Sequence, residues 1–570
     1  MTTEPVPVDV TSLRGRRAVN RWERMSVGDI LERLTWSYPD KEAVVGWPGA
    51  FADPQHRRLT YHQADRLANR FANALLAEGL SNGDMVAMLC ENSVEAYVAK
   101  IAVAKAGLVC VPINPNLAPD VVCYVLAQTE PRLVVVDAEV WPRVEAPLTA
   151  LGLQPRVTIP IGGDAVPGST TFTEFVAEAE GTEPETEIHA DDIWEILYTS
   201  GTTAMPKGVM LSHTYSYTCA LGYTVSMTRG LRLESEMRLC TFLPVIYHIG
   251  DHGFTLPAFF AGGTLIIGRR HDIPEVAAAV TQERVTALWG GAAPFLDALV
   301  SEASDDTRAH DLTSLTVLAY AWSAIPPPTA DALLGLCGRQ LTLLGLFGQT
   351  ESMSAFRFWP ARWPETYART APEVNYVGVP GPMLASVVTD EAGVSLRDTP
   401  GVTGEAVYRS PAVTAGYYRD EEATRTAFRH GWFHSGDACT YDDDGLVIMV
   451  DRFKDVVKSG GENVSSLRVE AVLAGHPDVA QVAVVGLPHV RWGEAVTAMV
   501  VMRPGRSVTE DDLIAFCRSR LAGFETPKRV VVLDSLPVSI GSKIKKYELR
   551  ARFAELYAAE GVPTTTGAEA

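Results

Sequence analysis

A run of small and hydroxylated residues around one lysine is the stretch best suited to chemistry. From Tyr198 to His213 the chain reads Tyr-Thr-Ser-Gly-Thr-Thr-Ala-Met-Pro-Lys-Gly-Val-Met-Leu-Ser-His. Hydroxyl groups and glycine-freed backbone N–H groups donate hydrogen bonds to an anion, and Lys207 adds a full positive charge. Pro206 restricts the backbone before the lysine and holds its ammonium near the loop. The pattern predicts a polyphosphate-binding loop, and it is not the Walker pattern because Pro-Lys-Gly replaces Gly-Lys-Ser/Thr.

Regular elements must position this loop. The apolar run from Ile193 to Leu197 predicts a strand before it, and we expect a helix from His213, because a strand–loop–helix arrangement places backbone donors at a phosphate. Upstream, between Leu59 and Val136, helical and strand patterns alternate. This alternation is typical of a parallel sheet covered by helices on both faces.

Length, charge and cysteine usage narrow the class of protein. A chain of 570 residues exceeds a single hydrophobic core, so we expect two or more lobes. The formal net charge of −20 argues against nucleic-acid binding, which depends on basic surface. The eight cysteines show neither Cys-x-x-Cys nor zinc-ligand spacing, and the first 22 residues lack the apolar core of a secretory signal. We therefore expect a cytoplasmic protein with no transmembrane segment.

Several motifs, in order, resemble one family. The loop resembles the phosphate-binding signature of the adenylate-forming superfamily, which includes acyl- and aryl-CoA synthetases, beetle luciferases and peptide-synthetase adenylation domains. Ala204 stands where that family usually has glycine. Similar motifs follow at 347–351, 431–437, 451–463 and 536–546, so that the resemblance spans about residues 25 to 550. The closest likeness is to stand-alone acyl-CoA synthetases.

The resemblance implies an α/β fold in two lobes. We expect a large N-terminal lobe of parallel-rich sheets covered by helices, followed by a small, mobile α+β lobe. The boundaries that it implies are residues 1–450 for the large lobe, 451–454 for a hinge and 455–570 for the small lobe.

The resemblance also assigns the ATP site. Thr350 is expected at the phosphates and Glu351 at Mg²⁺, a hard ion that usually takes carboxylates together with substrate phosphates. Asp437 is expected at the ribose hydroxyls, because one carboxylate accepts from both. The ATP-binding residues implied in this way are Thr199, Ser200, Gly201, Thr202, Thr203, Lys207, Gln349, Thr350, Asp437 and Arg452.

The acyl pocket is expected beside an aromatic–histidine pair, Tyr247 and His248, near the carboxylate of the substrate. The spacing from Pro244 is one residue longer than in common relatives. Trp322 falls where a glycine is usual, and we expect it to shape the pocket for an acid that is not a plain straight chain, although an ordinary core role explains it equally well. The remaining residues implied for the pocket are Ser323, Ala324 and Gly348.

The small lobe supplies the other implied residues. Lys543 matches the catalytic lysine, although Ser542 replaces the usual glycine before it and Lys545 and Lys546 are rival cations. Lys454 matches the hinge pivot. Lys458 and Asn463 match residues that position the acyl-adenylate, and Gly460 and Gly461 match the tunnel for coenzyme A.

The activity implied is ATP-dependent ligation of a carboxylic acid to coenzyme A through an acyl-AMP, with release of pyrophosphate and then AMP. Asp251 does not match the amino-binding aspartate of adenylation domains, so we expect a hydrophobic carboxylate, with fatty, aryl and polycyclic acids all open. Three alternatives stay open: a fatty acyl-AMP ligase that loads a carrier protein, a luciferase-like oxidation, and a non-catalytic nucleotide-binding relative. A homodimer is also left open.

Overall fold

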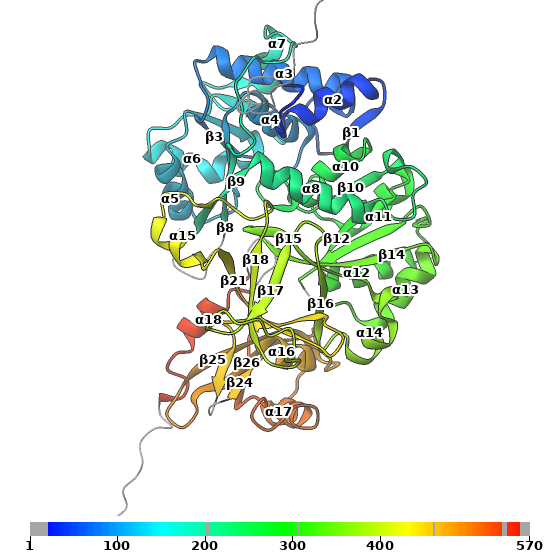
Figure 1. The fold of residues 1–570 in the computed structure, drawn as a ribbon, viewed down its shortest axis with the longest axis vertical. Coiled ribbons are helices and arrows are strands. Elements are labelled where there is room, and N and C mark those ends of the chain that lie inside the picture. The colour runs from blue at the N-terminus through cyan, green and yellow to red at the C-terminus, as the bar shows by residue number, and fades with distance from the viewer. Residues whose placement is uncertain are drawn as a thin grey trace, which may run out of the picture.

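The structure is a computed structural model, and it describes residues 21–199, 205–305, 307–322, 324–459, 462–538 and 544–558. It has a large lobe and a small lobe, arranged along the long axis of the molecule (Figure 1). The mixed α/β architecture confirms the expected fold class. The hinge boundaries stay a prediction.

One sheet of the large lobe carries the predicted phosphate loop. Its central strands are parallel, as the alternating sequence pattern predicted, and two antiparallel strands close one edge. In spatial order the eight strands are β19 (Gly416–Tyr417), β9 (Lys207–Ser212), β8 (Ile193–Thr199), β4 (Val109–Pro112), β3 (Met85–Leu89), β5 (Leu133–Asp137), β6 (Val157–Ile159) and β7 (Thr170–Thr171).

A second, longer path of paired strands crosses the large lobe. It is parallel from β1 to β14 and antiparallel beyond β14 and at β2. Its order is β17 (Ala385–Thr389), β18 (Gly404–Arg409), β21 (Trp432–Tyr441), β22 (Val447–Arg452), β16 (Asn375–Pro380), β15 (Ser352–Phe358), β14 (Thr342–Gln349), β13 (Val317–Ala321), β12 (Ala287–Gly291), β10 (Arg238–Thr241), β11 (Thr264–Ile267), β1 (Glu42–Gly46) and β2 (Arg58–Thr60), with β20 (Phe428–Arg429) beside β21.

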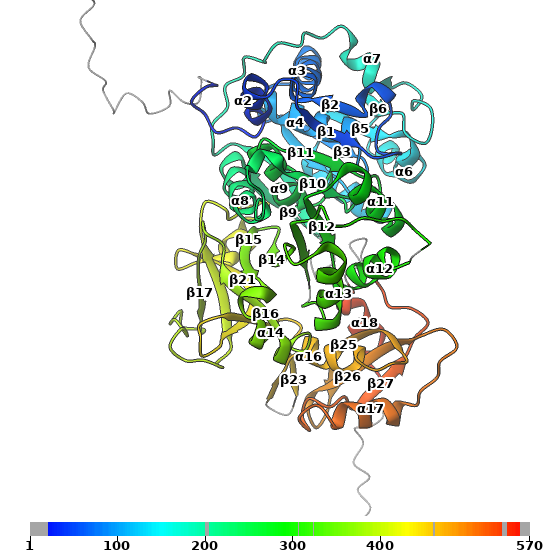
Figure 2. The same cartoon turned by 90° about the vertical axis from the view of Figure 1, so that its right-hand side faces the viewer.

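The helices of the large lobe pack against these sheets (Figure 2). They are α2 (Asp29–Ser37), α3 (Tyr61–Ala77), α4 (Val94–Lys105), α5 (Pro119–Thr129), α6 (Trp141–Ala150), α7 (Phe172–Ala177), α8 (His213–Met227), α9 (Gly250–Phe254), α10 (Leu256–Phe260), α11 (Ile273–Glu283), α12 (Ala293–Ala303), α13 (Pro327–Cys337), α14 (Pro364–Thr370) and α15 (Glu421–Ala427). Every residue of α4 is buried, including its two lysines. Among the described residues, no helix combines the length and apolar character that a membrane span requires.

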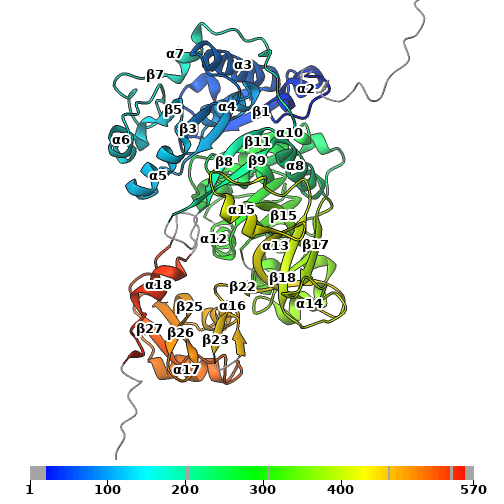
Figure 3. The same cartoon turned by 60° about the vertical axis from the view of Figure 1, so that its left-hand side comes forward.

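The small lobe is a separate α+β unit at one end of the molecule (Figure 3). Its sheet contains β24 (Glu462–Val464), β23 (Val457–Ser459), β26 (Gly493–Met502), β25 (Val479–His489) and β27 (Arg529–Val532). Its helices are α16 (Ser466–Ala474), α17 (Glu510–Arg518) and α18 (Lys546–Arg552). Valines from both long strands and leucines from the helices form its core.

The expected strand–loop–helix arrangement is wrong in one respect. A strand, β9, lies between the loop and the helix, and it pairs antiparallel with β8 so that Thr199 lies opposite Lys207. Helix α8 does begin at His213, where the hydroxyl of Ser212 accepts from the N–H of Tyr215 at 3.1 Å. The predicted phosphate loop therefore joins two strands of a hairpin and does not open a helix.

Candidate active site

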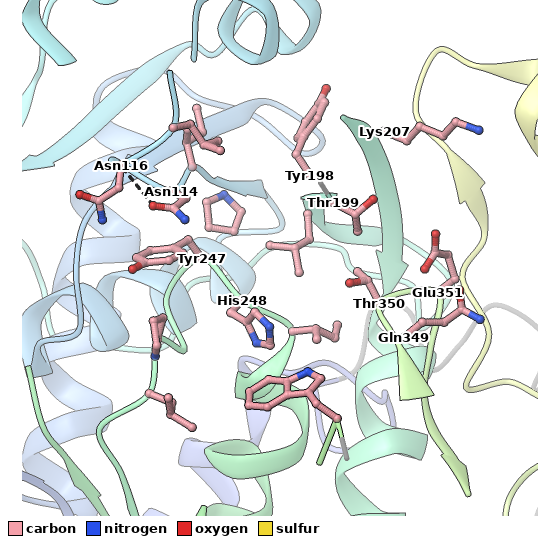
Figure 4. Close-up of a pocket in the computed structure, with 18 of the residues that line it drawn as sticks. Asn114, Asn116, Tyr198, Thr199, Lys207, Tyr247, His248, Gln349, Thr350 and Glu351 are labelled. Atoms are coloured by element: carbon pink, nitrogen blue, oxygen red, sulfur yellow. Dashed lines mark hydrogen bonds between the residues drawn. The ribbon is translucent and has the colours of Figure 1, made fainter. Parts of the chain in front are cut away.

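A cavity of about 840 Å³ brings together residues of the predicted ATP site and of the predicted acyl pocket. The following predicted site residues line it: Thr199, Lys207, Tyr247, His248, Trp322, Gln349, Thr350, Glu351, Arg452 and Lys454. Lys207, Gln349 and Glu351 lie at one end of the close-up view, and Tyr247 lies at the other (Figure 4). His248 and Thr350 lie between them.

The end near the hairpin presents a lysine and a carboxylate. Lys207 begins β9, and its ammonium nitrogen lies 4.9 Å from the centre of the Tyr417 ring. The hydroxyl of Tyr417 donates a 2.8 Å hydrogen bond to Oε1 of Glu351. Burial, with the Glu351 carboxylate next in weight, raises the pKa of Tyr417, so the phenol keeps its proton and remains a donor. Ser200, Gly201, Thr202 and Thr203 lie outside the described residues.

Glu351 and Thr350 occupy the turn between β14 and β15, where Gln349 pairs with Ser352. Only 9% of the surface of Glu351 is exposed. One oxygen of this carboxylate accepts a hydrogen bond from the Tyr417 phenol. A largely buried carboxylate at the wall of a cavity suits a hard divalent cation that also binds ligand phosphates.

Asp437 contacts two residues that line this end of the cavity. It pairs with Arg452 across strands β21 and β22, and Nε of Arg452 is 3.5 Å from its Oδ1. The side-chain amide of Gln349 approaches the other carboxylate oxygen at 3.5 Å. The antiparallel register thus pairs Asp437 with Arg452, and the end of β14 brings Gln349 to them, so that residues from three separate motifs meet.

Tyr247 and His248 come from the loop between β10 and α9. The N–H of Gly250 donates to Nδ1 of His248 at 3.0 Å, which assigns the proton of the neutral imidazole to Nε2. The hydroxyl of Tyr247 donates to Oε2 of Glu91 at 2.9 Å. The local structure thus fixes the tautomer of the histidine and the direction of the phenol.

Aromatic side chains form another wall. Trp289 stacks on Phe254 with ring centres 4.0 Å apart and planes inclined by 5°. Trp322 lies 5.5 Å from Trp289 and has a backbone φ of +73°, in the left-handed region that favours glycine. Its side chain lines the cavity, while its backbone has a conformation that glycine adopts without cost.

Two residues predicted for the acyl pocket, Ala324 and Gly348, are not among the residues that line the large cavity. Ala324 lines a separate, smaller cavity with Trp322, and Ser323 is outside the described residues. Gly348 is packed so closely in β14 that an added Cβ would meet the carbonyl oxygen of Met353 at 2.1 Å. The position therefore requires glycine for packing.

Sequence reasoning missed a polar group at the Tyr247 end. The side chain of Asn116 donates to Oε1 of Glu91 at 3.0 Å, and Arg143 donates to Asn116. The remaining polar residues at this cavity that the sequence did not single out are Asn114, Arg269, Arg270, His271, His434 and Ser435. Asn114 and Asn116 follow β4, and a position after the carboxyl end of a parallel strand was the available signal.

Two of the three candidate catalytic lysines in the small lobe form ion pairs with different glutamates. The ammonium of Lys546 lies 2.8 Å from Oε1 of Glu470, and that of Lys545 lies 2.9 Å from Oε1 of Glu548. Lys543, Gly460 and Gly461 lie outside the described residues.

Two further predicted residues stand on paired strands. Lys458 lies opposite Asn463 between β23 and β24, and its N–H donates to Oε2 of Glu494 at 2.7 Å. Lys458 is not among the residues that line the large cavity.

The fold and the cavity define a two-lobed α/β protein with a basic hairpin, a buried carboxylate and an aromatic wall. The family model of AMP-binding enzymes matches residues 31–418, and the model of the AMP-binding enzyme C-terminal domain matches residues 468–543. The chain belongs to the family of AMP-binding enzymes.

Named relatives and a solved structure agree with this assignment. The chain is 35% identical to a feruloyl-CoA synthase of Amycolatopsis over 500 residues, which cover 87% of this chain and 94% of that protein. It is 31% identical over 531 residues to the long-chain-fatty-acid–CoA ligase FadD13 of Mycobacterium tuberculosis, with coverage of 92% and 99%. The crystal structure of ATP-bound MatB from Rhodopseudomonas palustris matches with a TM-score of 0.78 at 29% identity, covering 94% of this chain and 100% of that one.

Proposed function

We propose that this enzyme activates a hydrophobic carboxylic acid with ATP to an acyl-AMP and then transfers the acyl group to the thiol of coenzyme A. The observation that carries this proposal is the single cavity in which Lys207 and Glu351 share one end while His248 faces the same space. An anion-binding end and an apolar wall in one cavity suit a ligand that joins a phosphate to an acyl group.

In the first half-reaction an oxygen of the acid attacks the α-phosphorus of ATP and pyrophosphate leaves. The ammonium of Lys207 neutralises negative charge on phosphate oxygens, and the hydroxyl of Thr350 orients them by donating a hydrogen bond. His248 lines the cavity, and we assign its imidazole to the carboxylate of the acid. We assign Lys543 to the bridge between that carboxylate and the α-phosphate.

Glu351 would hold Mg²⁺ together with the phosphates of ATP. The bound ion would spread the negative charge that develops on the phosphates. The chain's own contribution is to keep the Glu351 carboxylate in place, and the hydrogen bond from Tyr417 does so.

In the second half-reaction the thiol sulfur attacks the carbonyl carbon of the acyl-AMP, the C–O bond to AMP breaks, and the thiol proton is released. For this step we propose that the small lobe turns about Lys454, that Gly460 and Gly461 admit the pantetheine arm, and that Lys458 and Asn463 position the adenylate. Asp437 and Arg452 hold the ribose in both steps.

We propose an aromatic acid, in preference to a long flexible chain, as the substrate. Trp289 and Trp322 line the same cavity as His248, and aromatic rings bind planar partners by offset stacking. The feruloyl-CoA synthase among the relatives supports the same substrate class.

The test is acid-dependent pyrophosphate release across benzoates, hydroxycinnamates, polycyclic acids and fatty acids of increasing length, each with and without coenzyme A. We expect the highest kcat/KM for an aromatic acid and a thioester only when coenzyme A is present. Pyrophosphate without a thioester would instead indicate a carrier-protein acceptor, and ATP binding without pyrophosphate from any acid would overturn the ligase assignment.

A further inference from the structure

A buried cluster of charged side chains lies directly behind the loop that carries Tyr247 and His248. It contains Lys100 from α4, Glu195 from β8 and Asp251 from α9, and each is at most 2% exposed. A buried charge is costly unless it is paired and hydrogen-bonded, so a cluster of this kind needs a structural reason.

The ammonium of Lys100 uses all its donors inside the protein. Its Nζ lies 2.7 Å from Oε1 of Glu195, 2.6 Å from Oδ2 of Asp251 and 3.1 Å from the carbonyl oxygen of Ile246. Burial opposes the charged form, but the carboxylates of Asp251 and Glu195 outweigh it and raise the pKa of Lys100. The ammonium therefore stays charged and occupies the point where the two carboxylates converge, which a metal ion would otherwise need.

The neighbouring histidine completes the pairing of the carboxylates. Nε2 of His252, which is fully buried, lies 2.7 Å from Oε2 of Glu195 and 3.2 Å from Oδ1 of Asp251. The N–H of His252 also donates to Oδ1 of Asp251 at 2.8 Å. Both oxygens of each carboxylate thus have a partner, and neither side chain has freedom to turn.

The cluster joins the two sides of the cavity. Ile246 precedes Tyr247, so the bond from Lys100 holds the backbone at the aromatic–histidine pair. Glu195 stands on β8, the strand that ends at Thr199 on the cavity wall. Asp251 belongs to the helix that starts directly after the loop.

Asn92, which comes shortly before α4 in the chain, holds the start of the Tyr247–His248 loop. The amide of Asn92 donates to the carbonyl of Leu243 at 2.9 Å and accepts from the N–H of Val245 at 2.9 Å. With Lys100 bound at Ile246, the backbone of the loop is anchored immediately before the residues that face the cavity.

We infer that Lys100, Glu195 and Asp251 are positioning residues that fix the Tyr247–His248 loop against the strand leading to the phosphate end. The inference rests on the proposed function. An in-line attack needs the carboxylate of the acid and the α-phosphate at a set separation, and a displacement of about 1 Å at such a site lowers the rate by about a hundredfold.

Helix α4 offers a matched control. Lys105 is equally buried on the same helix, and its Nζ lies 2.8 Å from Oδ1 of Asp65 and 2.7 Å from Oε2 of Glu183. Neither lysine lines the large cavity, but Lys100 bonds to the carbonyl oxygen of Ile246 in the loop. Lys100→Met and Lys105→Met therefore remove the same chemical group from two similar ion clusters, only one of which touches the loop.

The experiment compares both variants with the wild type by thermal unfolding and by pyrophosphate release, using the acid with the highest wild-type rate. We expect both to lose thermal stability, but only Lys100→Met to lower kcat/KM for the acid, by about tenfold or more, while its KM for ATP stays within about twofold. Equal kinetic parameters in the two folded variants would overturn the inference and leave the cluster a purely structural feature.

Glu195→Gln keeps the shape of the cluster and replaces Lys100→Met if that protein does not fold. It should show the same selective loss for the acid, and unchanged acid kinetics in this variant would also contradict the inference. Absence of pyrophosphate from the wild type with every acid would overturn the proposed function and this inference together, whereas normal wild-type turnover with insensitive variants would overturn the inference alone.

Discussion

The hydroxyl of Tyr417 donates a 2.8 Å hydrogen bond to Oε1 of Glu351, and the ammonium of Lys207 lies over the ring of the same tyrosine. One side chain thus contacts both the cation and the carboxylate that we assign to the phosphates of ATP. Tyr417 stands on β19, which pairs with β9 and so keeps the ring beside Lys207. The sheet edge therefore organises the phosphate end of the cavity.

Tyr417→Phe should weaken the use of MgATP. The variant keeps the ring beneath Lys207 but removes a hydrogen bond to a carboxylate, which contributes about 1.5–3 kcal/mol. We expect kcat/KM for MgATP to fall by about tenfold at little cost in KM for the acid. Steady-state pyrophosphate release at varied MgATP measures this, with Tyr418→Phe as the control because that side chain does not line the cavity. An equal loss in the control would contradict the role of the Tyr417 hydroxyl.

Trp322 should control which acids are used. Trp322→Gly and Trp322→Ala both open the space beside Trp289, so we expect each to shift the ratio of kcat/KM values towards bulkier acids by about tenfold or more. Unchanged preference in both variants would show that Trp322 is only a packing residue.

Trp322→Gly and Trp322→Ala should differ in their free energy of unfolding. Alanine keeps a side chain at a φ of +73°, whereas glycine adopts that conformation freely. We expect Trp322→Gly to be more stable than Trp322→Ala by about 1 kcal/mol, measured by denaturant unfolding. The reverse order would mean that the backbone strain is not released at this position.

Local patterns predicted the alternation of helices and strands in the first part of the large lobe. Helix α3 lies in the stretch between Leu59 and Val136 where helical and strand patterns alternate, and it begins with a capping box in which Thr60 and Gln63 hydrogen-bond reciprocally. The same kind of signal was overlooked between residues 162 and 190, where Thr171 and Glu174 form a capping box at the start of α7. The glycine, proline and glutamate content of that stretch is typical of a linker and obscures so short a motif.

Pairing between strands was less accessible to sequence reasoning. Residues 207–212 became β9 because β8 lies beside them, and no local periodicity in so short a run distinguishes a strand from a loop. The polar group around Glu91 and Asn116 comes from strand ends that meet only in the folded sheet. Trp322 was noticed from its place in a motif, but its left-handed backbone follows from the structure alone.

His213 should make the protein sensitive to acid. Burial, with the charge of Arg24 second, lowers the pKa of His213 to about 3, and its Nδ1 accepts from the N–H of Val27 at 3.1 Å. The unfolded chain binds a proton at this histidine below about pH 6.5, whereas the folded chain does not until about pH 3, so stability is lost as the pH falls through that window.

His213→Asn retains an acceptor for Val27 but does not titrate. From pH 7 to pH 4.5 we expect the wild type to lose roughly 2–3 kcal/mol of unfolding free energy relative to this variant. Urea unfolding at the two pH values measures the difference. Parallel pH dependence of the two proteins would show that His213 takes up its proton without unfolding.

Lys543 should matter for adenylation and far less for thioester formation. Its two rivals within the described residues are each held by a carboxylate, Lys545 by Glu548 and Lys546 by Glu470. Burial opposes the charged form of Lys546, but Glu470 and Asp451 raise its pKa, which marks it as a structural cation. Lys543→Ala should therefore lower acid-dependent pyrophosphate release by about a hundredfold or more, because a preorganised cation at the α-phosphate is lost.

Thioester formation from supplied acyl-AMP should stay within about threefold of the wild type in the same variant, since that step needs no charge at the phosphate. Lys545→Ala is the matched control and should preserve both half-reactions, because an exposed ion pair contributes little. Equal loss of both half-reactions in Lys543→Ala, or a selective loss of adenylation in Lys545→Ala, would place the catalytic cation at another residue.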